Sequence, residues 1–169
     1  NTTGTNNTAV GYYAMLLNTT GTNNTAVGLN ALYTNTSGDN NVAVGVNCLR
    51  LNTTGQYNIA IGRDALEENT TSDANIALGH KALALNTVGA NNIAIGWEAL
   101  KNTTTDNNTG VGYRALQDNT TGERGTAFGA WALNNNTTGI RNVAVGYNAL
   151  GNNTTGQYNV AMGAYFLDA

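Results

Sequence analysis

The fold is decided by one stretch of seventeen residues, Asn18–Thr34, which reads NTTGTNNTAVGLNALYT. The same pattern returns along the whole chain of 169 residues. Its clearest marker is a glycine that recurs every seventeen residues, with a single step of sixteen residues from Gly96 to Gly112. A fixed period of this kind identifies tandem repeats, each of which is one structural unit stacked on its neighbours.

Ten copies of the repeat fill the chain. They span residues 1–17, 18–34, 35–51, 52–68, 69–85, 86–101, 102–118, 119–135, 136–152 and 153–169. The shorter sixth copy is missing one residue near Lys101, and Thr, including Thr103, takes the second position of every copy. We expect residues at equivalent positions to stack in register, and we call each such series a column.

Within one copy, the local chemistry predicts a single turn of a solenoid. Thr25-Ala26-Val27 is a short β-prone run, and Gly28 after it tolerates a positive φ. Asn18-Thr19-Thr20-Gly21 has the residues of a tight corner. Ala31-Leu32 is interpreted as a second short strand on the return side. The predicted fold is therefore all-β, a parallel β-solenoid (β-roll) of ten 17-residue coils.

The strand pattern also predicts which side chains point inward. Successive side chains alternate across a strand, so Ala26 and its column should face a narrow lumen, with the Val27 column on the opposite face. A continuous apolar stripe along a rod needs cover, which favours lateral association, most simply three chains around one axis. The reverse assignment, with the aliphatic columns inside a wider single-chain core, stays open here.

The residues resemble two related groups of proteins. The core Asn-x-Ala-Val/Ile-Gly-x-x-Ala, as in Asn24–Ala31, resembles the head repeats of trimeric autotransporter adhesins. The fuller pattern, with Asn-Thr-Thr-Gly before it, is similar to repeats of phage tail-fibre-like proteins, often found upstream of an endosialidase-type chaperone. The resemblance covers all ten copies. It implies a left-handed β-roll wound as a trimer, in a fibre that reaches or attaches to a host.

Composition excludes several other classes of protein. Charged residues make up 10% of the chain and the net charge is −3, so no basic patch suits a nucleic acid. The single cysteine, Cys48, excludes an intrachain disulfide framework and a multi-cysteine zinc site. No apolar run reaches the ~20 residues that a membrane-spanning helix needs, so we expect no membrane insertion.

Catalytic and cofactor chemistry is not indicated. Cys48 replaces an alanine of its column, and His80, the only histidine, lies two coils away in a different column. Acidic residues do not recur with calcium-binding spacing, and Gly110-Val111-Gly112 lacks the third glycine of a dinucleotide loop. We therefore expect a protein that is not an enzyme and that holds no cofactor and no metal.

Two sets of residues are candidates for function. Nine corner asparagines begin Asn-x-Ser/Thr and are possible N-glycosylation sites, although turn chemistry alone explains them. They are Asn1, Asn18, Asn35, Asn52, Asn69, Asn102, Asn119, Asn136 and Asn153. Aromatic residues in two neighbouring columns after the anchor glycine suit sugar stacking, an interface or ordinary corner packing. They are Tyr12, Tyr13, Trp97, Tyr113, Trp131, Tyr147 and Tyr165.

The sequence thus predicts a structural shaft or adhesin section of an extracellular, cell-surface or virion fibre. Its expected partners are two further copies of itself and a host surface receptor or glycan. Since no capping segment is visible, we expect it to be a section of a longer fibre. The alternative is a single-chain glycan- or ice-binding β-solenoid.

Overall fold

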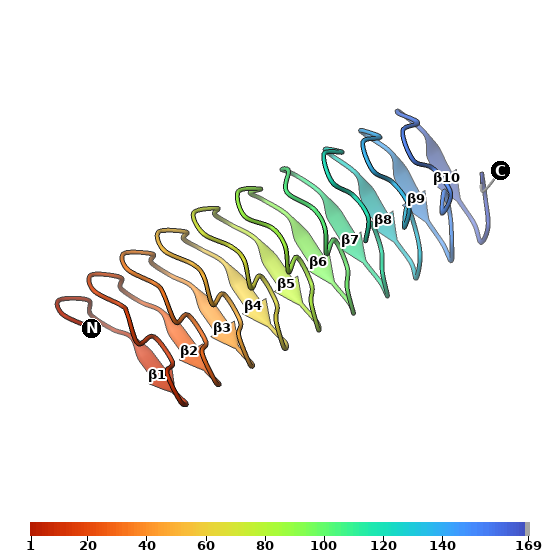
Figure 1. The fold of residues 1–169 in the computed structure, drawn as a ribbon. Coiled ribbons are helices and arrows are strands. Elements are labelled where there is room, and N and C mark those ends of the chain that lie inside the picture. The colour runs from red at the N-terminus through yellow and green to blue at the C-terminus, as the bar shows by residue number, and fades with distance from the viewer. Residues whose placement is uncertain (168–169) are drawn as a thin grey trace.

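A computed structural model describes residues 1–167 as a straight stack of coils, with the two chain ends at opposite ends of the rod (Figure 1). Each coil contributes one three-residue strand. The strands are β1 (Thr8–Val10), β2 (Thr25–Val27), β3 (Val42–Val44), β4 (Ile59–Ile61), β5 (Ile76–Leu78), β6 (Ile93–Ile95), β7 (Thr109–Val111), β8 (Thr126–Phe128), β9 (Val143–Val145) and β10 (Val160–Met162). The predicted all-β parallel solenoid is confirmed.

The strands form a single parallel sheet in sequence order, β1 to β10. Register follows the repeat, so that each alanine pairs with the alanine of the next coil, as Ala43 does with Ala60. At about 4.8 Å per step, the nine steps of the sheet span roughly 43 Å along the rod. Equivalent residues are therefore about 4.8 Å apart, which is the condition for side-chain ladders.

The lumen is filled by small and medium side chains. The alanine column of the strands is buried from Ala26 onward, with Gly110 taking its place in β7. The leucine column, from Leu32 to Leu150, is buried beside it. The prediction that alanine faces the lumen is confirmed, and the reverse assignment with the aliphatic columns inside is wrong.

The return side differs from the prediction: the expected second strand is absent from the described coils, where this segment forms turns. Every leucine of the column has a left-handed backbone, with φ of 50° at Leu32 and 49° at Leu49. Because the backbone does not alternate as in a strand, two adjacent residues such as Ala65 and Leu66 both lie inside. A left-handed conformation costs roughly 1–2 kcal/mol, whereas burying a leucine side chain gains about 1.5–3 kcal/mol.

The anchor glycine closes each strand where no other residue fits. Gly62 has φ of 131°, a region that side chains rarely adopt. A Cβ built on Gly62 would lie 2.6 Å from the carbonyl oxygen of Gly79 in the next coil. Both conformation and close approach therefore explain why every copy has glycine at this position.

Two buried asparagine columns tie the coils together at the corner. In the first, Asn52 donates to Asn35 Oδ1 (2.8 Å) and to the Gly55 carbonyl (3.0 Å). In the second, Asn41 Oδ1 accepts the backbone N–H of Asn58 (2.9 Å), while the Asn41 side chain donates to the Gly55 carbonyl (2.8 Å). The Gly55 carbonyl thus accepts hydrogen bonds from both asparagine columns, which satisfies polar groups that water cannot reach.

The short coil shifts the register that the sequence suggested. The backbone N–H of Thr103 bonds to the Leu100 carbonyl (3.1 Å), as that of Asn86 bonds to the Leu83 carbonyl (3.1 Å). Thr103 is fully buried, and its hydroxyl accepts from Asn119 (3.3 Å) in place of an asparagine. The hydrogen bonds therefore put Thr103, rather than Asn102, in the corner column, and the missing residue lies within the corner.

Candidate interaction surfaces

The outer side of the sheet is an uncharged, mostly apolar strip, which we call the strand face. It consists of the first and third residues of the ten strands, none of which is ionisable. Many of them are exposed; Ile61, Ile95 and Phe128 are examples from the middle of the rod. The alternation of the strand causes this, since the middle residue takes the inward position. The predicted exposed aliphatic columns are therefore present.

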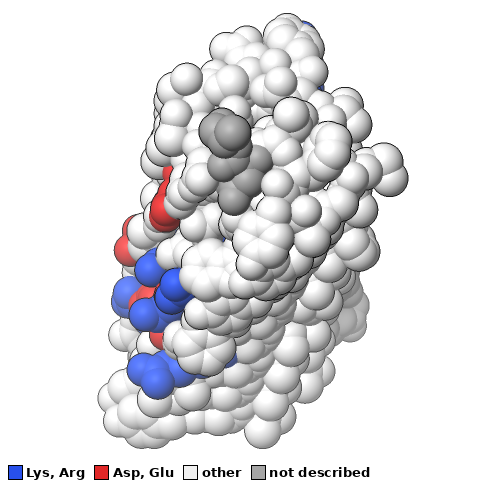
Figure 2. Space-filling view, turned by 90° about the vertical axis from the view of Figure 1, so that its right-hand side faces the viewer, with Lys and Arg blue, Asp and Glu red and all other residues white. Residues whose placement is uncertain are grey.

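Most of the charged residues lie elsewhere, on the segments between each anchor glycine and the next corner, which we call the turn face. Figure 2 shows most of the visible basic and acidic side chains at the left of the view, with most of the visible surface uncharged. The charged residues at these positions are Arg50, Arg63, Asp64, Glu67, Glu68, Lys81, Glu98, Lys101, Arg114 and Asp118. The two faces thus differ sharply in chemistry.

The predicted surface aromatics lie on the turn face. Tyr12, Tyr13, Trp97, Tyr113, Tyr147 and Tyr165 are exposed, and Trp131 is half-buried. The two columns pair across coils: the rings of Tyr113 and Trp131 are 5.1 Å apart, and those of Tyr147 and Tyr165 are 5.3 Å apart, both edge to face. Six of the seven aromatics are thus exposed, while their role in contact stays a prediction.

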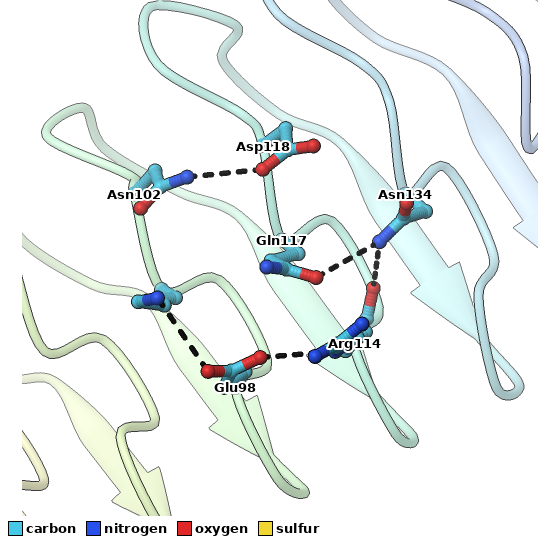
Figure 3. Close-up of polar contacts among 7 residues, drawn as sticks. Glu98, Asn102, Arg114, Gln117, Asp118 and Asn134 are labelled. Carbon is cyan, nitrogen blue, oxygen red and sulfur yellow. Dashed lines mark hydrogen bonds and ion pairs between the residues drawn. The ribbon is translucent and has the colours of Figure 1, made fainter.

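Sequence reasoning missed a polar network beside these rings (Figure 3). Arg114 Nε donates to Glu98 Oε2 (2.9 Å), and Glu98 Oε1 pairs with Lys101 Nζ (3.5 Å). Asn134 donates to the Arg114 carbonyl (3.0 Å) and to Gln117 Oε1 (3.3 Å). Opposite charges in one column, at Glu98 and Arg114, were the available signal. Glu98 thus anchors the arginine side chain, while Asn134 binds the arginine backbone.

A shallow hollow lies nearer the start of the rod, on the same turn face. It has a volume of about 270 Å³ and is lined by Tyr13, Asn30, Tyr33 and Arg50. The rings of Tyr13 and Tyr33 meet edge to face at 6.0 Å, and Arg50 Nε donates to Glu67 Oε1 (3.0 Å). Exposed rings beside polar groups therefore occur at two places along the turn face.

The glycosylation candidates lie in an unfavourable setting. Asn18, Asn35, Asn52, Asn69, Asn119 and Asn136 are buried. Their side-chain nitrogens donate to neighbouring coils and corners, as described for Asn52. A sugar on such a nitrogen would displace one of these hydrogen bonds and enter the lumen. Asn1, Asn102 and Asn153 are the members of the set that reach solvent, and turn chemistry accounts for the buried ones.

Three aspartates of one loop column bind the backbone of a neighbouring coil. Asp39, Asp73 and Asp106 accept the N–H groups of Thr22 (2.6 Å), Gln56 (2.7 Å) and Ala90 (2.7 Å) in the preceding coil. Residues 1–167 contain no group of three or more metal-binding side chains, and no helix there could cross a membrane. These carboxylates therefore have a structural role in joining coils.

Cys48 and His80 do not form a catalytic pair. Cys48 is buried and donates to the Gly62 carbonyl, whereas the imidazole of His80 lies against the Trp97 ring at 4.3 Å. Burial raises the pKa of the Cys48 thiol to about 11, which disfavours the reactive thiolate.

We expect the native Cys48 thiol to react with an aromatic disulfide reagent at pH 8 far more slowly than the urea-unfolded chain does. Since the folded pKa lies above the ordinary value near 9, the free energy of unfolding should fall as pH rises from about 9 to 11. Cys48→Ala, which restores the residue of that column, should remove this fall. A native thiol that reacts as fast as the unfolded one would contradict the burial.

Comparison with known proteins adds no relative to this picture, because no family model, curated protein or solved structure matches the chain.

Proposed function

We propose that this chain is a section of an extracellular, cell-surface or virion fibre, whose work is reach, rigidity and attachment rather than catalysis. The observation that carries this proposal is the strand face, an uncharged and mostly apolar strip that runs along a rod of coils stacked in register. The ladders that join each coil to the next support rigidity along the axis. Exposed apolar surface of this extent is typical of an interface between proteins.

The partner we propose for the strand face is the same face of two other copies. Identical chains associate most readily in closed symmetric assemblies, and an uncharged face avoids repulsion between like charges at such an axis. The resemblance to trimeric adhesin and tail-fibre repeats favours three chains over two, with left-handed winding. In this arrangement the turn faces point outward, where they can meet a host surface.

The rival proposal is a single-chain rod that binds ice or glycans through a threonine ladder. The geometry argues against ice binding, because threonine hydroxyls already donate hydrogen bonds to carbonyls of the next coil. Thr19 Oγ1, for example, donates to the Thr36 carbonyl (2.6 Å), and Thr36 Oγ1 donates to the Thr53 carbonyl (3.0 Å). A monomeric mass would favour this rival.

The test is the mass of the chain in solution by light scattering. We expect three times the chain mass of 17.5 kDa, falling to the single-chain value when Ile95→Glu puts a charge on the strand face. Leu85→Glu is the matched control, since Leu85 on the turn face is 39% exposed and Ile95 is 38% exposed. Circular dichroism shows whether each variant keeps its strands.

A monomer at micromolar concentration would overturn the shared strand face, and a dimer would overturn the threefold arrangement. Equal loss of mass in both variants would also count against the proposal, because a non-specific effect of added charge would then explain it. Retention of the trimer by Leu85→Glu alone assigns the interface to the strand face.

A further inference from the structure

The turn face carries an aromatic row in the middle of the rod. His80, Trp97 and Tyr113 occupy one column in three successive coils, and Trp131 follows from the neighbouring column of the next coil. The His80 and Trp97 rings are 4.3 Å apart, and the Tyr113 and Trp131 rings 5.1 Å. Trp97 is 50% exposed and Tyr113 is 41% exposed. Four coils at about 4.8 Å make this row roughly 14 Å long.

A fixed cation lies within this row. The guanidinium carbon of Arg114 is 5.1 Å from the centre of the Tyr113 ring and 5.0 Å from that of Trp131. Glu98 holds the same guanidinium through Nε, and Lys101 and Asn134 complete the network of Figure 3. The row therefore offers flat apolar rings next to hydrogen-bonding groups whose positions are set before any ligand arrives, which lowers the entropic cost of binding.

This combination matches the chemistry of a sugar. A pyranose ring has a face of C–H groups that packs on an aromatic ring and a rim of hydroxyls that needs donors and acceptors. Nucleic-acid bases also stack on aromatic rings, but they come with a phosphate backbone, and the chain has a net charge of −3. Glu98 beside Arg114 also leaves little net positive charge for a strongly anionic ligand.

We propose that the turn face of the fifth to eighth coils, residues 80–134, binds a linear, largely uncharged oligosaccharide lying along the rod. Pyranose rings pack on Trp97, Tyr113 and Trp131, while the guanidinium of Arg114, which Glu98 holds through Nε, donates to hydroxyl groups. This site deepens the attachment role proposed for the fibre and rests on it, since the turn face must point outward from the assembly.

The test begins with the full chain on a printed array of bacterial and animal surface glycans, followed by titration of the best-bound oligosaccharide in solution. Both tryptophans of the chain belong to the row, so their fluorescence reports this site alone. Trp131→Asn, with the residue that Asn30 and Asn47 supply in that column, and Tyr113→Ala should each weaken binding about tenfold or more. Tyr147→Ala, in the Tyr113 column two coils away, is the matched control and should bind normally.

Absence of any retained glycan on the array would overturn the site, as would binding that Tyr147→Ala weakens as much as Tyr113→Ala. Binding confined to charged glycans would overturn the proposed ligand class. Light scattering on the same samples separates this proposal from the fibre itself. A trimer that binds no glycan refutes only the site, whereas a monomer that binds through the row refutes only the shared strand face.

Discussion

Replacing Gly129 with alanine should lower the free energy of unfolding by more than about 3 kcal/mol, or prevent folding. Gly129 has φ of 140°, and an alanine Cβ there would lie 2.4 Å from the carbonyl oxygen and 2.7 Å from the carbonyl carbon of Gly146. The next coil cannot move away, because Gly146 N–H is bonded to the Phe128 carbonyl (2.8 Å). Denaturation in urea followed by circular dichroism measures the loss.

The same coil offers the matched control, Gly125→Ala. A Cβ on Gly125 would meet the side chains of Asn108 at 3.3 Å and Leu116 at 3.4 Å, and its φ is not in the left-handed region. Small movements of side chains can accommodate this, so we expect a change within about 1 kcal/mol. If both substitutions cost the same, the loss would come from adding a Cβ anywhere in the coil. The positive φ and close approach of the anchor column would then not be its cause.

The anchor column could be predicted from the sequence because its requirement is local. A residue that must adopt a strongly positive φ and touch the next coil must be glycine in every copy, so its period reveals the coil directly. The exposed aliphatic strip followed for a similar reason. Side chains alternate along the short strand, so when the alanine points into the lumen the residues on either side of it must point outward.

The turn on the return side could not be predicted, because it requires a left-handed backbone at leucine, a conformation that leucine normally avoids. Nothing in Ala65-Leu66 signals that Leu66 has φ of 49°, and a strand is the ordinary interpretation of such a pair. Only closure of a seventeen-residue coil brings both side chains inside. A narrow coil thus needs the left-handed turn, and burial of the leucine offsets its cost.

The corner asparagines were recognised by type but not by role. Turn chemistry explained them one coil at a time, whereas the recurrence of asparagine along the rod reflects hydrogen bonds between coils. At the shortened corner, Thr103 keeps the ladder with its hydroxyl while Asn102 turns outward to Asp118 (3.0 Å). The sequence pattern assigned Asn102 to the corner column because of its residue type, whereas the hydrogen bonds of the structure assign Thr103 to it.

If the ladders stabilise the rod, Asn58→Asp should cost more than about 3 kcal/mol of unfolding free energy at pH 7, although the side chains are nearly the same size. The Asn58 amide nitrogen donates to the Ser72 carbonyl (2.8 Å) and to Asn41 Oδ1 (3.2 Å). A carboxylate would put oxygen against both acceptors in a buried site. Its Oδ1 could still accept the N–H of Asn75 (3.0 Å), so the loss comes from the two donor bonds and the buried charge.

The dependence of this loss on pH separates charge from shape. Burial beside acceptors would raise the pKa of the new carboxyl above its ordinary value, so the folded state would bind the proton more tightly than the unfolded chain. Stability of the variant should therefore recover, relative to the parent, as pH falls from 7 toward about 4. Asn91→Asp, at an exposed corner position, is the control and should change the free energy of unfolding by less than about 1 kcal/mol. A loss in Asn58→Asp that does not change with pH would mean that the new carboxylate is in contact with solvent. The asparagine column would then consist of ordinary turn residues and not of a buried hydrogen-bond ladder.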